Sequence, residues 1–496
     1  STDNSYANAY ATSNAGIRIQ SFETTDTATG NLVGVNKGTI NLNNGSGNVG
    51  IYALDVENAT NNIMGTNHYE ILGENTTRGT INVAGTNVGM MAQDKSGTVT
   101  NYKTIIRNSG RINVNGTNSV GMYTADKDSY AEQLNGAVIT AKSKNVGVVN
   151  NGKFNFATGG IINADGESSV GVYSANGTDS TTTLSGTLNV LNGGVGLYAN
   201  EGSTQKLIGL TANVSGTASA GSILFYNLPK TGTNKGFFDL SDTNPGTATI
   251  GANSFAFYTT NNIFALGSNA FATFLNDWKG TTTGTGLDLT MNTGSSLLLT
   301  DVSTATTVTD RTIQFTNITP PIAPGTSTLK NAQSTPETVA TLNSASGDYF
   351  YVTLKGADVK IDENIDLSVG TNKLNKVSIY DSDITVENGK TIQDGATPNV
   401  SASGNLISQG YILGVNNGRT LTNNGTITLN STSPDELKVL VAMGKNTAGT
   451  TASKAINDGT ITSKIKKGIA IYASDGAEGT NKSNKSITMD GDGAFG

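Results

Sequence analysis

Gly79-Thr80-Ile81-Asn82-Val83 is a short phrase that returns along this 496-residue chain, and Val88-Gly89-Met90-Met91 follows it. The same pair occurs earlier as Gly38-Thr39-Ile40-Asn41-Leu42 with Val49-Gly50-Ile51-Tyr52. The glycine of the second phrase recurs at Gly50, Gly89, Gly121, Gly147, Gly171 and Gly196. Self-similarity at this scale is typical of a repeat architecture, in which one small unit is stacked many times.

The polarity and spacing of the phrases indicate what the unit is. Ile40 and Leu42 alternate with Thr39 and Asn41, and this period of two is that of a half-buried strand. Successive glycines of the second phrase are 39, 32, 26, 24 and 25 residues apart. Two or three short strands with polar turns fill one coil of about 24 residues. We therefore predict an all-β parallel β-helix (β-solenoid) with loop insertions, whose coils stack about 4.8 Å apart.

Asparagine precedes the glycine that opens several strands. Asn36, Asn108, Asn423 and Asn457 each stand two residues before such a glycine. Both residue types tolerate left-handed backbone angles, so we expect them to adopt such angles at the corners between the faces of the coil. Stacked asparagine side chains hydrogen-bond in ladders in cross-β structures, and similar ladders are expected here. A structural role for these residues is favoured over a functional one.

The composition excludes several classes of protein. Charged residues make up 14% of the chain and the net charge is −7, so no basic surface is available for nucleic acid. The chain has no cysteine, which rules out disulfides and thiolate chemistry. No run of about 20 apolar residues marks a membrane span. No signal segment stands at Ser1 and residues 485–491 resemble another coil, so we expect a mature chain or a fragment.

We predict one continuous β-helix over residues 1–496, with three regions. Residues 1–200 hold the regular repeats, and regular coils resume over 346–496. Residues 201–345 are aromatic-rich and proline-rich coils and loops, to which we assign a recognition role as a hypothesis. Four of the eight prolines lie between positions 320 and 336, which indicates a loop leaving the β-helix or an edge segment.

The sequence offers little for catalysis. His68 is the only histidine and no Gly-x-Ser-x-Gly motif supplies a nucleophile, so no catalytic residue is predicted. No metal or cofactor is predicted either, because a zinc site of the usual kind and phosphate-binding loops are both absent from the sequence. Carboxylates gather over 361–366 and 380–383, where solvated strand or turn faces are the favoured interpretation and metal binding the alternative.

Aromatic residues concentrate in one part of the chain. Eight of the fourteen phenylalanines lie between Phe225 and Phe274, and the only tryptophan, Trp278, follows. Aromatic side chains stack on sugars and anchor interfaces, but they also fill the interior of a coil. The polar, turn-like surroundings of Trp278 are compatible with exposure, so it is the candidate ligand-binding residue, with burial as the alternative. The tyrosines that follow several Val-Gly phrases are expected to form an outward-facing stacked column.

The Gly-Thr-Ile-Asn-Val and Val-Gly-Met-Tyr repeats resemble the passenger regions of large type V autotransporters of the fusobacterial adhesin type. The resemblance covers residues 31–200 well and 415–475 moderately. It implies an extracellular β-helix at the bacterial cell surface, attached to the outer membrane only through a C-terminal β-barrel that this sequence does not contain. Such passengers attach bacteria to host-cell surface proteins, glycans or partner bacteria. No family binding motif is recognisable, so the resemblance identifies no site residues.

Three functions stay open at this point. The leading hypothesis is a non-enzymatic adhesin passenger that binds through loops at about 201–345, by many weak contacts and a few aromatic anchors. The second is a purely structural stalk segment of a longer adhesin. The third is a β-helical polysaccharide-degrading enzyme, which would need an acid cluster with basic neighbours on one face, and none is recognisable. A monomer is expected, because no heptad repeats indicate a trimer.

Overall fold

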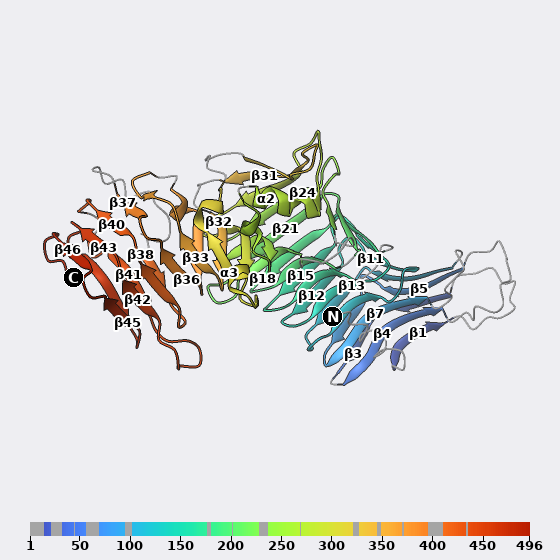
Figure 1. The fold of residues 1–496 in the computed structure, drawn as a ribbon. Coiled ribbons are helices and arrows are strands. Elements are labelled where there is room, and N and C mark those ends of the chain that lie inside the picture. The colour runs from blue at the N-terminus through green and yellow to red at the C-terminus, as the bar shows by residue number, and fades with distance from the viewer. Residues whose placement is uncertain are drawn as a thin grey trace. The chain divides into compact units, whose positions relative to one another are not determined.

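The computed structural model consists mainly of short strands stacked in parallel, which confirms the predicted all-β parallel β-helix (Figure 1). The residues it describes are 14–20, 32–43, 45–55, 69–94, 102–175, 180–200, 202–227, 237–267, 269–320, 327–344, 349–369, 372–394, 410–432 and 435–496. The chain divides into two compact units. The first comprises Ser1–Phe257, Leu275–Ser295 and Gly325–Ala345, and the second Tyr258–Phe274, Ser296–Pro324 and Ser346–Gly496. The single continuous domain stays a prediction.

Each regular coil of the first unit contributes one strand to each of three sheets, called faces A, B and C. Face A consists of β1 (Ala15–Gln20), β4 (Ser46–Asp55), β7 (Thr86–Asp94), β10 (Val120–Thr124), β13 (Val146–Asn150), β16 (Val170–Ser174), β19 (Val195–Ala199), β22 (Ser222–Asn227) and β25 (Ser254–Thr259). Face B consists of β2 (Leu32–Asn36), β5 (Tyr69–Asn75), β8 (Tyr102–Asn108), β11 (Ser129–Gln133), β14 (Lys153–Phe156), β17 (Thr181–Leu184), β20 (Thr204–Leu207), β23 (Phe237–Asp239) and β26 (Trp278–Lys279).

Face C completes the coils of the first unit. It consists of β3 (Thr39–Leu42), β6 (Thr80–Val83), β9 (Arg111–Val114), β12 (Val138–Lys142), β15 (Ile161–Asp165), β18 (Thr187–Leu191), β21 (Leu210–Ser215), β24 (Gly246–Ile250), β27 (Leu287–Met291), β31 (Thr338–Ser344) and β30 (Ser327–Lys330). A short 3-10 helix, η2 (Leu275–Asp277), precedes β26. β30 pairs antiparallel with β31 at the edge of the face. The proline-rich stretch therefore contains an edge strand, one of the two predicted alternatives.

The second unit has four series of parallel strands, called faces D to G. Face D is β28 (Ser296–Asp301), β32 (Phe350–Lys355) and β35 (Val377–Tyr380). Face E is β29 (Thr312–Gln314), β33 (Asp358–Ile361), β36 (Asp383–Val386), β39 (Thr420–Asn423), β42 (Lys454–Asn457) and β45 (Glu478–Asn481). Face F is β34 (Ile365–Asp366), β37 (Thr391–Gln393), β40 (Thr426–Leu429), β43 (Thr460–Ser463) and β46 (Ser486–Met489). Face G is β38 (Tyr411–Val415), β41 (Lys438–Met443) and β44 (Ile469–Ser474). The helical turns of the second unit are η1 (Ile263–Leu266), α2 (Ala270–Phe274), α3 (Val308–Arg311), η3 (Phe315–Asn317) and η4 (Lys373–Asn375).

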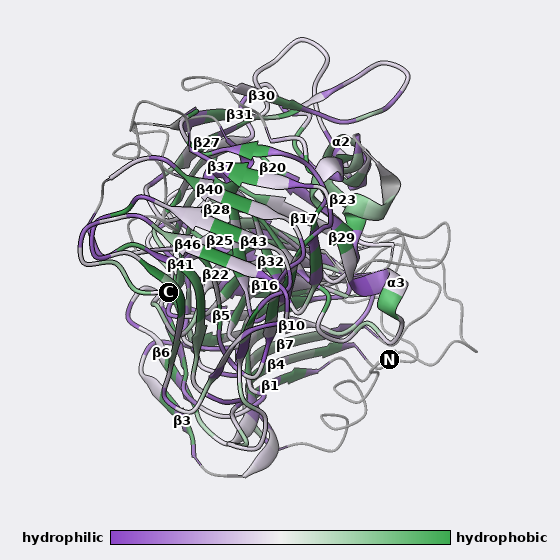
Figure 2. Ribbon diagram, turned by 60° about the vertical axis from the view of Figure 1, so that its left-hand side comes forward, coloured by the Kyte–Doolittle hydropathy of each residue, from purple (hydrophilic) through white to green (hydrophobic). Residues whose placement is uncertain are grey.

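Aliphatic side chains stack in register inside the coils. Ile81, Ile112 and Ile139 occupy equivalent positions in successive face C strands and have no exposed surface. Burying each such side chain contributes about 1.5–3 kcal/mol. The same pattern gives the hydrophobic segments on β37 and β40 in the second unit (Figure 2). The interior of the β-helix is thus a set of aliphatic columns that the period-two pattern predicts.

The glycine of the second phrase is required where neighbouring coils approach closely. A Cβ on Gly89 would lie 2.6 Å from the carbonyl oxygen of Gly121 and 3.0 Å from the side chain of Ile112. Gly121 approaches the carbonyl oxygen of Gly147 in the same way. A larger residue would push the coils apart, which explains why glycine recurs at this position.

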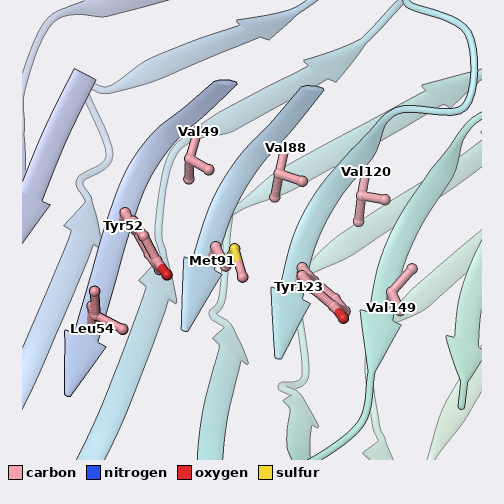
Figure 3. Close-up of a cluster of buried hydrophobic side chains, with 8 residues drawn as sticks. All are labelled: Val49, Tyr52, Leu54, Val88, Met91, Val120, Tyr123 and Val149. Atoms are coloured by element: carbon pink, nitrogen blue, oxygen red, sulfur yellow. The ribbon is translucent and has the colours of Figure 1, made fainter. Parts of the chain in front are cut away.

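In the later coils the tyrosines of face A are partly exposed, whereas the preceding residues of the same strands, Val172 and Leu197, are fully buried. Tyr173, Tyr198 and Tyr226 are in register, with ring centroids 4.8 Å apart at each step. The predicted tyrosine column is confirmed in these coils. In earlier coils the column alternates with other apolar residues and belongs to a buried cluster (Figure 3). The cluster consists of Val49, Tyr52, Leu54, Val88, Met91, Val120, Tyr123 and Val149.

A ladder of buried amides runs along the corner between faces B and C. Asn36 Nδ2 donates to Asn75 Oδ1 at 2.9 Å, and Asn75 Nδ2 donates to Asn108 Oδ1 at 2.8 Å. Asn108 Nδ2 donates to Gln133 Oε1 at 2.8 Å. Each amide therefore satisfies the next one in a buried environment, and the predicted ladder is confirmed.

The prediction of left-handed backbone angles is wrong for the Asn-x-Gly sequences on which it was based. Neither Asn108 nor Gly110 has a positive φ, and the Gly110 N–H instead donates to Asn108 Oδ1 at 3.1 Å. Positive φ occurs at other glycines of this corner, such as Gly136 (76°) and Gly159 (79°), and at the next corner at residues such as Asn118 (56°), Lys144 (62°) and Ser168 (60°). Gly110 is needed for space, because a Cβ there would overlap with the carbonyl oxygen of Gly79 in the neighbouring coil.

Alanine at Gly110 should therefore destabilise the first unit by about 1–3 kcal/mol, the usual cost of overpacking. Gly38 is the matched control, since it opens the equivalent strand, has no positive φ and has no atom within 4 Å of an added Cβ. The Gly38→Ala variant is expected to be neutral or to gain up to about 1 kcal/mol through the unfolded chain. Urea unfolding followed by circular dichroism compares the two, and equal unfolding midpoints would contradict the explanation.

Removing one amide from the buried ladder should cost more than removing one from a ladder that is only partly buried. The Asn108→Ala variant takes a partner from Asn75 and from Gln133, and each buried group left unsatisfied costs about 1–3 kcal/mol. Asn113 is the control, because its Nδ2 donates to Asn82 Oδ1 at 2.8 Å on the outer side of face C. Alanine there should cost less than about 1 kcal/mol. Similar urea midpoints for both variants would refute a stabilising role for burial of the ladder.

Candidate functional site

Trp278, the candidate ligand-binding residue, lies in the interior of the first unit with 0% of its side chain exposed. Its ring stacks on Phe238 with centroids 5.6 Å apart and meets Phe257 edge-on at 5.2 Å. Its expected exposure is wrong, because β26 pairs with β23 and places this side chain in the coil interior beside Phe238. Trp278 cannot contact a ligand from this position, so the aromatic region supplies core packing here.

The other residues singled out in the sequence have different outcomes. His68 lies outside the described residues. In the group at 361–366, Asp362 accepts hydrogen bonds from the N–H and Oγ1–H of Thr316 at 2.9 and 2.8 Å, which is a local structural role. The group at 380–383 borders a pocket in the second unit.

This pocket has a cavity volume of about 260 Å³ and lies where one side of the coil is interrupted. β36 pairs with β39 and β37 pairs with β40, so faces E and F continue from one coil to the next. Face D ends at β35 and face G starts at β38, and these two strands are not paired within the described part of the chain. The pocket lies between them and is lined by Phe350, Val377, Ser378, Ile379, Tyr380, Asp381, Ser382, Tyr411, Gly414, Val415, Asn416 and Met443.

Asp381 provides the charged wall of the pocket. Arg419 Nε donates to Asp381 Oδ1 at 2.8 Å, and Asn417 Nδ2 donates to the same oxygen at 2.9 Å. The backbone of Asp381 has a φ of 46°, in the left-handed region that Asp and Asn tolerate better than most residues. Its carbonyl oxygen accepts the Gly356 N–H at 3.0 Å. The carboxylate is therefore held in one orientation by its backbone and by two donors.

Two further carboxylates on face E and a second arginine, on α3, lie near Asp381. Asp358 and Asp383 are in register on β33 and β36. Arg311 lies 3.8 Å from Asp358, and Arg419 lies 4.0 Å from Asp383. Burial raises the pKa of Asp383 and Asp358 adds to the rise, whereas the Thr420 N–H and Arg419 lower it. The arginines compensate the like charges that register places side by side.

Sequence reasoning singled out the carboxylates at 380–383 but did not connect them with Asp358 or with the two arginines. Asp358 and Asp383 are separated by one coil of 25 residues, and Arg311 comes from an earlier part of the unit. The signal that identifies the pair is the coil length itself, because residues one coil apart stack directly on each other. Predicting it would require the register of the second unit, whose phrases are less regular than those of the first.

No cation site accompanies these carboxylates. Among the described residues no group of three or more His, Asp or Glu side chains is placed to hold a metal ion. The pocket is therefore characterised by its aromatic rings, Asp381 and neutral polar groups.

None of the helices in the described ranges is long and apolar enough to cross a membrane.

Another set of carboxylates lies at the ends of face A strands in the first unit. Asp55 and Asp94 are in register, and the Asp94 N–H donates to Asp126 Oδ2 at 2.7 Å. Ser129 donates its N–H and its Oγ–H to Asp126 Oδ1 at 3.0 and 2.7 Å. Burial raises the pKa of Asp126 to about 6, although the bonds from Ser129 and Asp94 lower it. Asp126 is thus protonated in the folded chain over a range in which an unfolded chain ionises it.

The raised pKa of Asp126 predicts a pH dependence of stability. The folded state retains a proton between about pH 4 and 6 that the unfolded state releases, so the free energy of unfolding should fall as the pH rises through this window. The Asp126→Asn variant, though less stable because its amide faces the Asp94 N–H, should lose this fall. Asp458→Asn is the control, because Lys482 and Lys485 hold the pKa of Asp458 low. An unchanged pH profile of unfolding for Asp126→Asn would contradict the prediction.

The sequence matches no protein-family model, and no curated protein is similar to it in sequence. The resemblance to autotransporter passengers is therefore carried by the repeated phrases alone.

Proposed function

We propose that this chain is a non-enzymatic adhesin passenger, displayed outside the cell at the bacterial outer membrane by type V secretion. The observation that carries the proposal is the stacking of its repeated phrases into coils of a parallel β-helix. The resemblance of those phrases to fusobacterial-type passengers supports the same function. The proposed partners are host-cell surface proteins, glycans or partner bacteria, and the net charge of −7 argues against nucleic acid.

The polar exterior of the coils supports a role outside the cell. Asn82 Nδ2 donates to Asn41 Oδ1 at 2.7 Å and Asn113 Nδ2 donates to Asn82 Oδ1 at 2.8 Å along the outer side of face C. These ladders connect coils without any disulfide, in a chain that has no cysteine. A surface of amides and hydroxyls remains hydrated at any pH or salt concentration that the cell exterior presents, because it does not depend on ionic groups.

We assign recognition to the pocket of the second unit instead of the region 201–345. Phe225, Phe257 and Trp278 of the expected region are buried in the interior of the first unit. In the second unit Tyr380 is 55% exposed and borders the pocket together with Asp381. An exposed aromatic ring beside an oriented polar group is a common element of binding sites.

Polysaccharide cleavage is the second candidate function, favoured by the acids and arginines on face E. Asp358 and Asp383 form the acid cluster with basic neighbours that a β-helical enzyme would need. Each is already engaged, since Arg311 lies beside Asp358 and the Thr420 N–H donates to Asp383 at 2.7 Å. Such contacts stabilise the stacked strands and occupy the carboxylates, which favours a binding protein over an enzyme. A stalk segment without its own ligand is the remaining alternative.

The purified chain is expected to bind host cells, partner bacteria or a glycan array saturably, and to release no new reducing ends from polysaccharides. Surface plasmon resonance and a reducing-end assay measure the two properties. Binding by no partner, with circular dichroism showing intact β-structure, would favour the stalk. Polysaccharide cleavage that Asp383→Asn abolishes would favour the enzyme.

A further inference from the structure

We propose that the pocket between β35 and β38 binds a single neutral sugar ring of a glycan. This inference rests on the proposed adhesin function and names the ligand class of that pocket. It is carried by three observations on the lining residues: the size of the cavity, the placement of the aromatic rings, and the oriented carboxylate of Asp381.

The size of the cavity selects a small ring over a peptide strand. Two strand edges border the gap, so an added β-strand is the obvious competing occupant. Ordinary pockets for drug-sized ligands measure about 300–1,000 Å³. A cavity of about 260 Å³ lies just below that range, which suits one six-membered ring with its hydroxyls. An extended segment long enough to pair with all of β38 would need far more space.

Aromatic rings at the mouth and wall provide a surface for the apolar face of a sugar. Tyr380 is 55% exposed at the end of β35, and Phe350 lies deeper with 8% exposed. Tyr411 packs against the backbone of Gly414, where an added Cβ would lie 2.7 Å from its ring. Glycine at this position allows the tyrosine ring to lie flat along the strand. The C–H faces of sugars pack on such rings in the way that aliphatic groups do.

The polar wall supplies acceptors for sugar hydroxyls. Both donors to Asp381, Arg419 and Asn417, bind its Oδ1, and within the described part of the chain no hydrogen bond to its Oδ2 is found. An ionised carboxylate accepts hydrogen bonds from neighbouring hydroxyl groups. Asn416 adds an amide that both donates and accepts. The site therefore offers an apolar surface with polar groups at its rim, which matches the two sides of a sugar ring.

The charge of the lining selects against acidic sugars. Asp381 is the one charged side chain among the described residues that line the pocket, and Arg419 is already bound to it. A sialic or uronic acid would place a second carboxylate near Asp381 without a cation of its own. Like charges in a partly desolvated site repel each other, so neutral hexoses and N-acetylhexosamines are the expected ligands.

The test compares the whole chain with two variants on an array of neutral, sialylated and uronic-acid-containing glycans. Tyr380→Ala removes an exposed ring without disturbing the core, and Asp381→Asn keeps a residue that tolerates positive φ while replacing Oδ2 by a donor. Each is expected to weaken binding of neutral glycans at least about tenfold. Phe237→Ala is the control, since this exposed aromatic residue lies on β23 in the first unit and should not affect binding.

Any of four outcomes would overturn the inference. If the parent chain and both variants bind neutral glycans equally well, this pocket is not the binding site. The inference also fails if the parent chain binds only acidic glycans. Binding of extended peptides that Tyr380→Ala weakens would show that a β-strand is the occupant instead. If the parent chain binds cells but does not bind neutral glycans, the pocket inference fails and the adhesin function stands. Calorimetry with methyl glycosides as competitors measures the affinity directly.

Discussion

Backbone hydrogen bonding between coils, about 4.8 Å apart, is the constraint on which the rest of this structure depends. Because the coils pair in register, a side chain meets the same position of the next coil, as Ile81 meets Ile112 and Asn82 meets Asn113. Each position must therefore hold a residue that packs well against copies of itself. Aliphatic groups do so inside and amides do so at the corners, whereas like charges repel. A charged fraction of only 14% is a consequence of this rule.

The same rule explains how far the sequence could be interpreted. Alternation and repeat spacing predict the strands, the coil and the buried ladder through Asn108, because these features arise from local periodicity. The positive φ of Lys144 and Ser168 was not predicted, since neither residue type marks a left-handed turn. Trp278 was misjudged for a related reason. Its neighbours in sequence are polar, but its burial depends on Phe238 in the adjacent coil.

Carboxylates are the exception, because like charges in adjacent coils repel each other. Asp358 and Asp383 stack one coil apart, and arginines on both sides compensate them. Asp126 lacks such a cation among its hydrogen-bonding partners, and burial raises the pKa of its carboxyl group to about 6. A carboxylate in this fold is thus compensated by a cation, as on β33 and β36, or retains its proton because it is buried, as Asp126 does. Predicting whether a given carboxylate is compensated by a cation requires the register, because the compensating residue comes from a different coil.

A periodic fold has few places for a specific ligand, because each coil presents the same kind of surface as the next. Specificity must then come from positions at which the periodicity fails. In the second unit faces E and F keep the register while the third side is interrupted between β35 and β38, so two sides continue to hold the coils together. The interruption turns unpaired strand edges, Tyr380 and Asp381 into a pocket. Regular stacking and local failure of stacking are therefore complementary, since the first supplies rigid walls and the second supplies the site.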